Sequence, residues 1–308
     1  MAKTLVTGGA GFIGSHVSQR YLNQGHQVVI IDNLSTGRED NIPKGAKFYK
    51  ADISDLKTLE TIFKEEKLDV VNHHAAQIDV RESLENPQKD ATINIVGGIN
   101  LLELSKKQGV KKFIYAATGG ALYGEASQGP SQENSPINPI SHYGVSKYCL
   151  EHYIDLCSRL YNINFTILRY ANVYGPRQNP LGEAGVIAIF IHAMLDGKNP
   201  MIYGDGEQLR DYVYVEDIAK ANLMALSSGD KMTINLGTGK TTSVNKLFQI
   251  LGEVLNFKGK PQFKPKRGGE IFRSVLDVGL AKNVFHWNAE VSLQKGLENT
   301  VAWQRSAC

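Results

Sequence analysis

A tyrosine and a lysine four residues apart are the clearest candidates for acid–base chemistry in this sequence. Tyr143 and Lys147 lie in the segment YGVSK, and on a helix this spacing places both side chains on one face. A free phenol has a pKa of about 10, but a neighbouring ammonium group favours the phenolate. The pair can then take a proton from an alcohol. Thr118, at the end of an expected strand upstream, adds a hydroxyl group to this set.

A glycine-rich turn, TGGAGFIG at residues 7–14, follows the first expected strand and opens a helix. The glycines at positions 8, 11 and 14 allow a tight turn, close approach of the backbone to a pyrophosphate and close packing of the helix. The free N–H groups of the helix then face the phosphates. The same turn without any ligand is the plainer interpretation of the glycines alone.

Two aspartates follow the next strands and refine this prediction. Asp32 ends the second strand, where a carboxylate takes the ribose hydroxyls of a dinucleotide. Its charge would repel a 2′-phosphate, so it predicts NAD rather than NADP. Asp52, after the third strand, either accepts from the adenine amino group or caps a helix. An oxidised nicotinamide would further favour the Tyr143 phenolate.

The elements that must position these residues alternate between apolar strands and amphipathic helices. We expect strands at 4–7, 27–31, 47–50, 70–74, 112–117 and 165–169, and helices at 13–24, 55–66, 86–108 and 141–161. This alternation predicts an α/β fold, a doubly wound parallel (Rossmann) sheet.

The rhythm changes after residue 172, where loops rich in Gly, Asn and Pro interrupt shorter elements. We therefore expect an NAD-binding domain at 1–172, with 212–236 returning to it. Residues 173–211 and 237–308 would form a smaller C-terminal substrate-binding lobe over the carboxyl ends of the strands, where such sheets bind ligands.

Composition excludes several classes of function. The 308 residues are 42% hydrophobic and 21% charged, which predicts a large core rather than disorder. A net charge of +3 without a basic run argues against a nucleic-acid partner. The basic residues at 258–267 form either a solvated loop or an anion site. No apolar run or signal peptide predicts a membrane partner, and three cysteines without CxxC spacing suit a reducing cytoplasm.

Taken as a set, the motifs resemble the extended short-chain dehydrogenase/reductase family. The resemblance rests on TGGAGFIG, Asp32, HHAAQ (73–77), ATGGALYG (117–124), YGVSK, RYANVYGP (169–176), RDYVYVEDIA (210–219) and NLGTG (235–239). Within the family the likeness is to the UDP-sugar 4-epimerases. It implies an enzyme that inverts C4 of a UDP-hexose, UDP-glucose or UDP-galactose, through a 4-keto intermediate and with tightly bound NAD.

The resemblance also implies roles for individual residues. The catalytic residues would be Tyr143, Lys147 and Thr118, although the segment after Thr118 is one residue longer than is usual in the family. Cofactor contacts would come from Gly8, Gly11, Phe12, Ile13, Gly14, Asp32, Asn33, Asp52, Ile53, Ala75, Ala76, Gln77, Asn94, Tyr143, Lys147 and Tyr170. Substrate contacts would come from Thr118, Tyr143, Asn172, Gly185, Val186, Tyr203, Arg210, Arg267, Glu270, Arg273 and Ser274. His73 and His74 are not expected to bind a metal, because neighbouring strand residues point to opposite faces.

Several alternatives stay open. Related dehydratases and decarboxylases carry an acidic residue directly after the position of Thr118, whereas this chain has Gly119. Another UDP-sugar, UDP-GlcNAc/UDP-GalNAc or UDP-glucuronate, would suit the same motifs, and the small Ser274 would leave room for an acetamido group. A dehydrogenase that releases NADH and a non-catalytic NAD-binding regulatory protein are further alternatives.

The sequence also bears on assembly. The helices at 86–108 and 141–161 carry apolar residues on more than one face. Their second faces predict a homodimer through a four-helix bundle, as is common in the family, although contact with a neighbouring helix of the same chain would also cover them.

Overall fold

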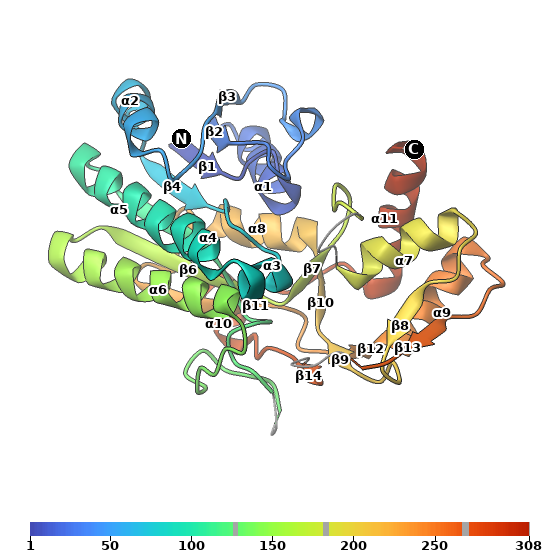
Figure 1. Ribbon diagram of the computed structural model, residues 1–308. Coiled ribbons are helices and arrows are strands. Elements are labelled where there is room, and N and C mark those ends of the chain that lie inside the picture. Colours follow the sequence, from blue (N-terminus) through green and yellow to red (C-terminus); the bar gives the residue numbers. More distant parts are fainter. Residues whose placement is uncertain (126–128, 181–184, 267–270, 308) are drawn as a thin grey trace.

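A seven-stranded parallel sheet forms the centre of the computed structural model (Figure 1), which describes residues 1–125, 129–180, 185–266 and 271–307. The strand order is β11-β6-β5-β4-β1-β2-β3. The strands are β1 (Lys3–Thr7), β2 (Gln27–Asp32), β3 (Lys47–Lys50), β4 (Val70–His73), β5 (Lys112–Thr118), β6 (Asn164–Tyr170) and β11 (Met232–Leu236). The predicted α/β fold with a doubly wound parallel sheet is confirmed.

Helices cover both faces of this sheet (Figure 1). The apolar sides of α2 (Leu56–Glu66), α5 (Gly97–Gln108) and α6 (His142–Tyr161) share one core with the sheet. On the other face lie α1 (Phe12–Asn23), α8 (Val215–Ala225) and α10 (Gly279–Phe285). The inner strands are therefore buried on both sides, which is why they read as nearly continuous apolar runs, whereas the edge strand β3 stays partly exposed.

The remaining elements form a smaller group with a core of its own, around α7 (Val186–Leu195), α9 (Val244–Leu255) and α11 (Leu293–Ala307). Its short strands are β7 (Asn172–Tyr174), β8 (Met201–Tyr203), β9 (Leu209–Arg210), β10 (Tyr212–Tyr214), β12 (Thr242–Ser243), β13 (Gln262–Lys264) and β14 (Arg273–Ser274). They pair as β10-β7, β12-β9-β14 and β13-β8. After β10 the chain returns to the main sheet through α8 and forms β11, which pairs with β6 at the edge of that sheet.

The expected helix at 86–108 is confirmed as a continuous helical run from Pro87 to Gln108, but a π turn within it was not predicted. A short helix α3 (Val80–Glu85) precedes α4 (Pro87–Ala91), and a π-helical turn η2 (Thr92–Val96) joins α4 to α5. Pro87 occupies the first turn of α4, a position that tolerates its missing N–H. Because a π turn inserts an extra residue, it alters which side chains of the helix face inward; such turns occur often at functional sites.

No helix among the residues that the structure describes is both long and apolar enough to span a bilayer. A 3-10 turn, η1 (Glu39–Asn41), lies between β2 and β3.

Candidate active site

The glycine turn between β1 and α1 leaves no space for side chains. A Cβ added to Gly14 would lie 2.2 Å from the Gly8 carbonyl oxygen, and one on Gly8 would lie 2.7 Å from the Ala75 nitrogen. Gly8 has a φ of 68°, in the left-handed region that favours glycine. No side chain caps the N-terminus of α1, and its first turn has no acidic residue. Its N–H groups thus suit the pyrophosphate of a dinucleotide.

Asp32 lies beside this turn with its carboxylate held by the backbone. One oxygen accepts a hydrogen bond from the Ala10 nitrogen at 3.0 Å, and the other accepts from the Leu34 nitrogen at 2.8 Å. The side chain is therefore fixed at the end of β2, where a ribose would meet it.

Asp52 is held by side chains from two loops. It accepts from the Asn33 amide at 2.7 Å and from the Ser54 hydroxyl at 2.6 Å. Asp55, rather than Asp52, caps α2 by accepting from the Thr58 nitrogen. The alternative interpretation of Asp52 as the helix cap is wrong. Ile53 beside it is buried, and a Cβ on Gly97 would clash with its side chain at 2.7 Å.

Three polar groups converge where β5 ends. They belong to Thr118, Tyr143 and Asn172, and Thr118 is hydrogen-bonded to the Tyr143 phenol. The first turn of α6, which carries Tyr143, is fixed by Ser141, which caps the helix by accepting from the Gly144 nitrogen at 3.1 Å. The Asn172 Oδ1 atom is buried without a hydrogen-bond partner. It lies 3.7 Å from the position that a Cβ on Gly120 would take, and the Thr118 hydroxyl lies 4.0 Å from that position.

Lys147 lies one turn along α6 and is 3% exposed. Its Nζ atom is 4.3 Å from the centre of the Tyr115 ring. Burial lowers its pKa to about 7, and burial together with the negative charge of Asp90 raises the pKa of Tyr143 to about 12. Desolvation disfavours the phenolate in the chain without NAD. The preference for the phenolate, which rests on Lys147 together with an oxidised nicotinamide, stays a prediction.

A buried ion pair lies one turn beyond Lys147. Glu151 accepts from the Arg169 Nε atom at 3.0 Å and from its Nη2 atom at 2.5 Å. Arg169 also donates to the Tyr123 hydroxyl at 2.7 Å, and Tyr123 donates to Asn235 at 2.8 Å. The pair thus fixes the segment after Thr118 against β6 and β11. Sequence reasoning missed Glu151, although its spacing from Lys147 was the available signal.

The loop after β4 is tied to the π turn. Asn94 accepts from the Gln77 nitrogen at 2.9 Å and donates to the Gln77 carbonyl oxygen at 3.0 Å. Its Nδ2 atom also lies 3.1 Å from the Ser146 hydroxyl, to which it donates. Ala75 and Ala76 lie in the same loop, so the π turn connects this loop directly to α6.

The two histidines of β4 and its following loop face different partners. The His73 Nδ1 atom lies 2.8 Å from the Thr7 hydroxyl, and the His74 Nε2 atom lies 3.3 Å from the Tyr170 hydroxyl. Burial lowers the pKa of both rings, that of His74 to about 3. Tyr170 is buried and also accepts from Asn222 at 2.8 Å. Within the described ranges, no group of three or more His, Cys, Asp or Glu side chains could hold a metal ion.

A second candidate subsite is a cavity of about 280 Å³ in the smaller group of elements. It is lined by Tyr203, Gly204, Asp205, Gln208, Lys266, Ile271 and Phe272. Tyr203 ends β8, and the partly exposed Phe272 is a lining aromatic that sequence reasoning missed. Two aromatic rings and a lysine around one hollow suit a nucleotide base and a phosphate.

Two arginines flank this cavity on paired strands. Arg210 on β9 donates to the Phe272 carbonyl oxygen at 3.1 Å, and the buried Ser274 of β14 pairs with Arg210 in the strand register. Arg273 lies beside Ser274, and its Nε atom is buried without a partner. Gly185 stands at the N-cap position of α7, and Val186 begins that helix. Arg267 and Glu270 lie outside the described residues.

Comparison with known proteins agrees with this geometry. Residues 4–237 match the NAD dependent epimerase/dehydratase family. A Methanocaldococcus jannaschii protein that carries the provisional name UDP-glucose 4-epimerase is 49% identical over 302 residues, which cover 98% of each chain. The UDP-glucose 4-epimerase of Thermotoga maritima, solved with UDP-glucose, superposes with a TM-score of 0.98 at 47% identity, covering 99% of each chain. The Thermus thermophilus enzyme, solved with NAD, has a TM-score of 0.95 at 40% identity over 99% of this chain and 100% of its own.

Proposed function

Because the chain belongs to the NAD dependent epimerase/dehydratase family, we propose that it is an NAD-dependent UDP-glucose 4-epimerase that inverts C4 of a UDP-hexose. The observation that carries this proposal is the convergence of Thr118, Tyr143 and Lys147 at the end of β5, on the same edge of the sheet as the glycine turn. A hydroxyl, a phenol and an amine at that edge suit acid–base work on a sugar alcohol. The likeness to UDP-glucose 4-epimerases of nearly equal length supports the substrate class.

The residues of the chain divide the reaction between them. Tyr143 takes the proton of the 4-hydroxyl, with Thr118 hydrogen-bonded to the phenol and positioned to hold the same oxygen. Lys147 as an ammonium stabilises the phenolate. The glycine turn and Asp32 would hold NAD, which when bound would supply the reversible hydride acceptor that inversion at C4 needs. Asn172, with its free Oδ1 atom, is positioned to bind a sugar hydroxyl.

The nucleotide part of the substrate fits the second subsite. Tyr203 and Phe272 line the cavity and can contact the uracil ring. Arg210 and Arg273 lie on paired strands next to it, and arginine forks suit the oxygens of a diphosphate. The Arg273 Nε atom, buried without a partner, is the donor that such a ligand would satisfy.

The alternatives differ in what the site must contain. A dehydratase or decarboxylase needs an acid after Thr118, and a Cβ on Gly119 would lie 2.5 Å from the Leu276 side chain. The small side chain of Ser274 would leave room for the acetamido group of UDP-GlcNAc or UDP-GalNAc. UDP-glucuronate is a third candidate substrate. A dehydrogenase would exchange its cofactor, whereas an epimerase keeps it; a regulatory protein would bind NAD without turnover.

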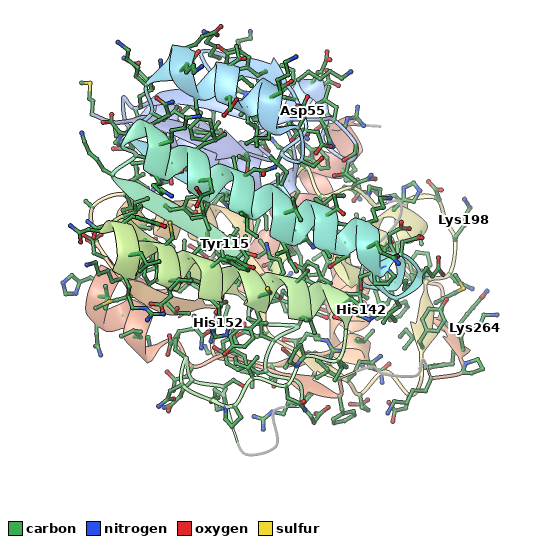
Figure 2. All side chains as sticks on the ribbon, turned by 60° about the vertical axis from the view of Figure 1, so that its left-hand side comes forward. Asp55, Tyr115, His142, His152, Lys198 and Lys264 are labelled. Atoms are coloured by element: carbon green, nitrogen blue, oxygen red, sulfur yellow. The ribbon has the colours of Figure 1, made fainter. Side chains whose placement is uncertain are left out.

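The proposal includes a homodimer. Large apolar side chains of η2 and α6 are exposed, among them Val96, Val145, Tyr153, Leu156 and Leu160. In Figure 2, α5 and α6 lie side by side at the front of the molecule, with His142 and His152 on α6. Two such helix pairs would bury these residues in a four-helix bundle. The free thiols of Cys149 and Cys157 suit the reducing cytoplasm that we propose as its location.

An epimerisation assay on the wild type and on Tyr143→Phe, which removes only the phenol hydroxyl, tests the proposal. Purified protein is incubated with UDP-galactose and UDP-glucose without added NAD, and the products are separated by chromatography. Tyr143→Phe should keep the fold and lose about 10²–10⁴-fold in turnover, the range for removal of a general base. The matched control is Tyr161→Phe at the exposed end of the same helix, which should leave turnover unchanged. A Tyr143→Phe protein within a few-fold of the wild type would reject this base.

A further inference from the structure

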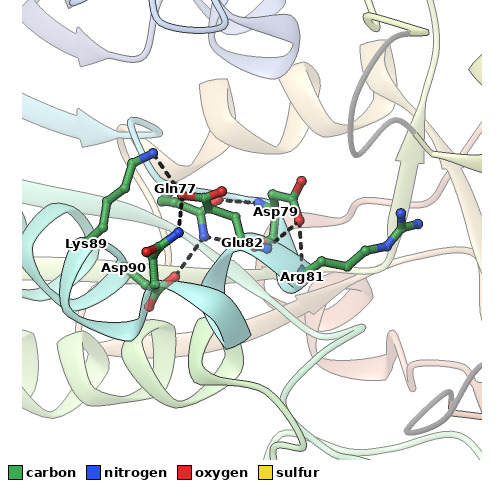
Figure 3. Close-up of polar contacts among 7 residues, drawn as sticks. Gln77, Asp79, Arg81, Glu82, Lys89 and Asp90 are labelled. Carbon is green, nitrogen blue, oxygen red and sulfur yellow. Dashed lines mark hydrogen bonds and ion pairs between the residues drawn. The ribbon is translucent and has the colours of Figure 1, made fainter.

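A buried carboxylate near the catalytic pair has no part in the function described so far. Asp90 of α4 is 1% exposed. Its Oδ1 atom accepts hydrogen bonds from the Gln77 side chain at 3.1 Å and from the Asn94 side chain at 3.0 Å, and Figure 3 shows its contact with Gln77. Among the ion pairs of the described residues, none includes Asp90. Its carboxylate is therefore held inside the protein by neutral amides, and a buried carboxylate without a cationic partner is costly.

The hydrogen bonds of Asp90 determine how Asn94 is oriented. Because the Asn94 amide nitrogen faces Asp90, the Asn94 Oδ1 atom faces the Gln77 nitrogen. The same amide nitrogen reaches the Ser146 hydroxyl, and Ser146 lies on α6 between the two catalytic residues. Helix α4 packs directly on α6. Asp90 thus joins the loop after β4, the π turn and the catalytic helix.

The charges around Lys147 leave Asp90 with a distinct role. Glu151 also faces Lys147, but Arg169 neutralises it at 2.5 Å. The other titratable groups that face Lys147 are the buried rings of His73 and His74 on the β4 side, both kept neutral, and Tyr115 on β5. The negative charge of Asp90 raises the pKa of Lys147, of Tyr143 and of Tyr115. It is the buried negative charge near Lys147 without a neutralising arginine or lysine among the described ion pairs.

We propose that Asp90 is a positioning residue for the catalytic pair, which orients Asn94 between Gln77 and Ser146 and supplies the counter-charge that keeps Lys147 an ammonium. The role assigned to Lys147 rests on the proposed epimerase function, whereas the counter-charge itself does not. Burial holds the pKa of Lys147 at about 7, against Glu151 and Asp90, which raise it. Without Asp90, more of the lysine is the neutral amine at neutral pH, and an amine does not stabilise a phenolate.

The first test needs no activity. The protein is labelled with ¹³C at the lysine Cε atoms and titrated by NMR, and Lys147→Met assigns the resonance. We expect the Lys147 midpoint to fall by on the order of one pH unit in Asp90→Asn, the usual effect of a nearby charge. The matched control is Asp79→Asn, because Asp79 caps α3 in the same region and asparagine also caps helices. An unchanged Lys147 midpoint in Asp90→Asn would overturn the proposal.

The second test measures kcat against pH. Removal of the Asp90 charge lowers the pKa of Lys147, so the limb of the profile that reports Lys147 should move to lower pH in Asp90→Asn. Asp90→Glu keeps the charge and should return this limb to its wild-type position. A purely structural residue would lower kcat equally at every pH, and that result would refute the assignment.

Two further outcomes are separable. If Asp90→Asn does not fold, Asp90→Ser is the second neutral variant and must give the same shift of the Lys147 midpoint. If the midpoint shifts but neither wild type nor variants epimerise a UDP-sugar, the counter-charge is supported and the proposed function fails.

Discussion

Replacing Gly14 by alanine tests whether the turn between β1 and α1 is built for a dinucleotide. The new Cβ would lie 2.2 Å from the Gly8 carbonyl oxygen and 3.1 Å from the Gly9 Cα atom. Backbone atoms cannot rotate away, so the start of α1 must move relative to β1. Overpacking of this kind costs about 1–3 kcal/mol, and the better helix propensity of alanine returns about 1 kcal/mol. We expect a net loss of up to about 2 kcal/mol in the free energy of unfolding.

The effect on cofactor binding should be larger than the effect on folding suggests. A helix N-terminus contributes up to about 2 kcal/mol to binding of an anion in a partly buried geometry. Moving the first turn of α1 away from the pyrophosphate should therefore weaken NAD binding by about 10–30-fold. Isothermal titration calorimetry on protein stripped of its bound NAD measures the dissociation constant, and urea unfolding measures the stability of the same protein.

The matched control is Gly252→Ala in α9. A Cβ there would meet its nearest atom, the Phe257 carbonyl oxygen, at 3.8 Å, which is an ordinary contact. This variant should gain about 0.4–1 kcal/mol in stability through the unfolded state and bind NAD like the wild type. The reasoning is refuted if Gly14→Ala binds NAD as tightly as the wild type, or if Gly252→Ala weakens binding equally.

Three further predictions follow from other parts of the molecule. Asp32→Ala should reduce the preference for NAD over NADP, because the carboxylate that repels a 2′-phosphate is gone; a wild type that binds NADP more tightly than NAD would contradict this role. Leu160→Glu on the exposed face of α6 should convert a dimer into a monomer in light scattering at micromolar concentration, and a monomeric wild type would count decisively against the four-helix bundle. Ser274→Tyr should selectively remove turnover of UDP-GlcNAc and UDP-GalNAc while urea unfolding checks the fold; equal loss with both substrate pairs, or no acetylated turnover in the wild type, would reject the position as the determinant.

Local periodicity explains why much of the fold could be predicted from the sequence. Strand and helix patterns place apolar residues on defined faces over distances of a few residues. The glycine turn and the carboxylate of Asp32 both follow strand ends, so their placement at one edge of a parallel sheet needed only the alternation of elements. The expected strand at 70–74 was long by one residue, since β4 ends at His73.

The patterns failed where the chain departs from regular periods. The π turn at 92–96 interrupts what reads as one long apolar helix. An extra residue in a turn leaves the composition of the helix unchanged, so hydrophobic spacing cannot reveal it. The identity of the α2 cap was also decided by local geometry, because Asp52 and Asp55 are equally suitable by type.

The sequence by itself determined which groups can do chemistry in this protein: the glycine turn, the Asp32 carboxylate, and the phenol and amine of Tyr143 and Lys147 on one helical face. Only the tertiary structure decided the charge state of those groups. Asp90 raises the pKa of Tyr143 although 53 positions of sequence separate them. The partner that neutralises Glu151 is Arg169, which comes from β6. Burial and charge act through space in a medium of low dielectric constant, and neither can be read from the order of residues along the chain.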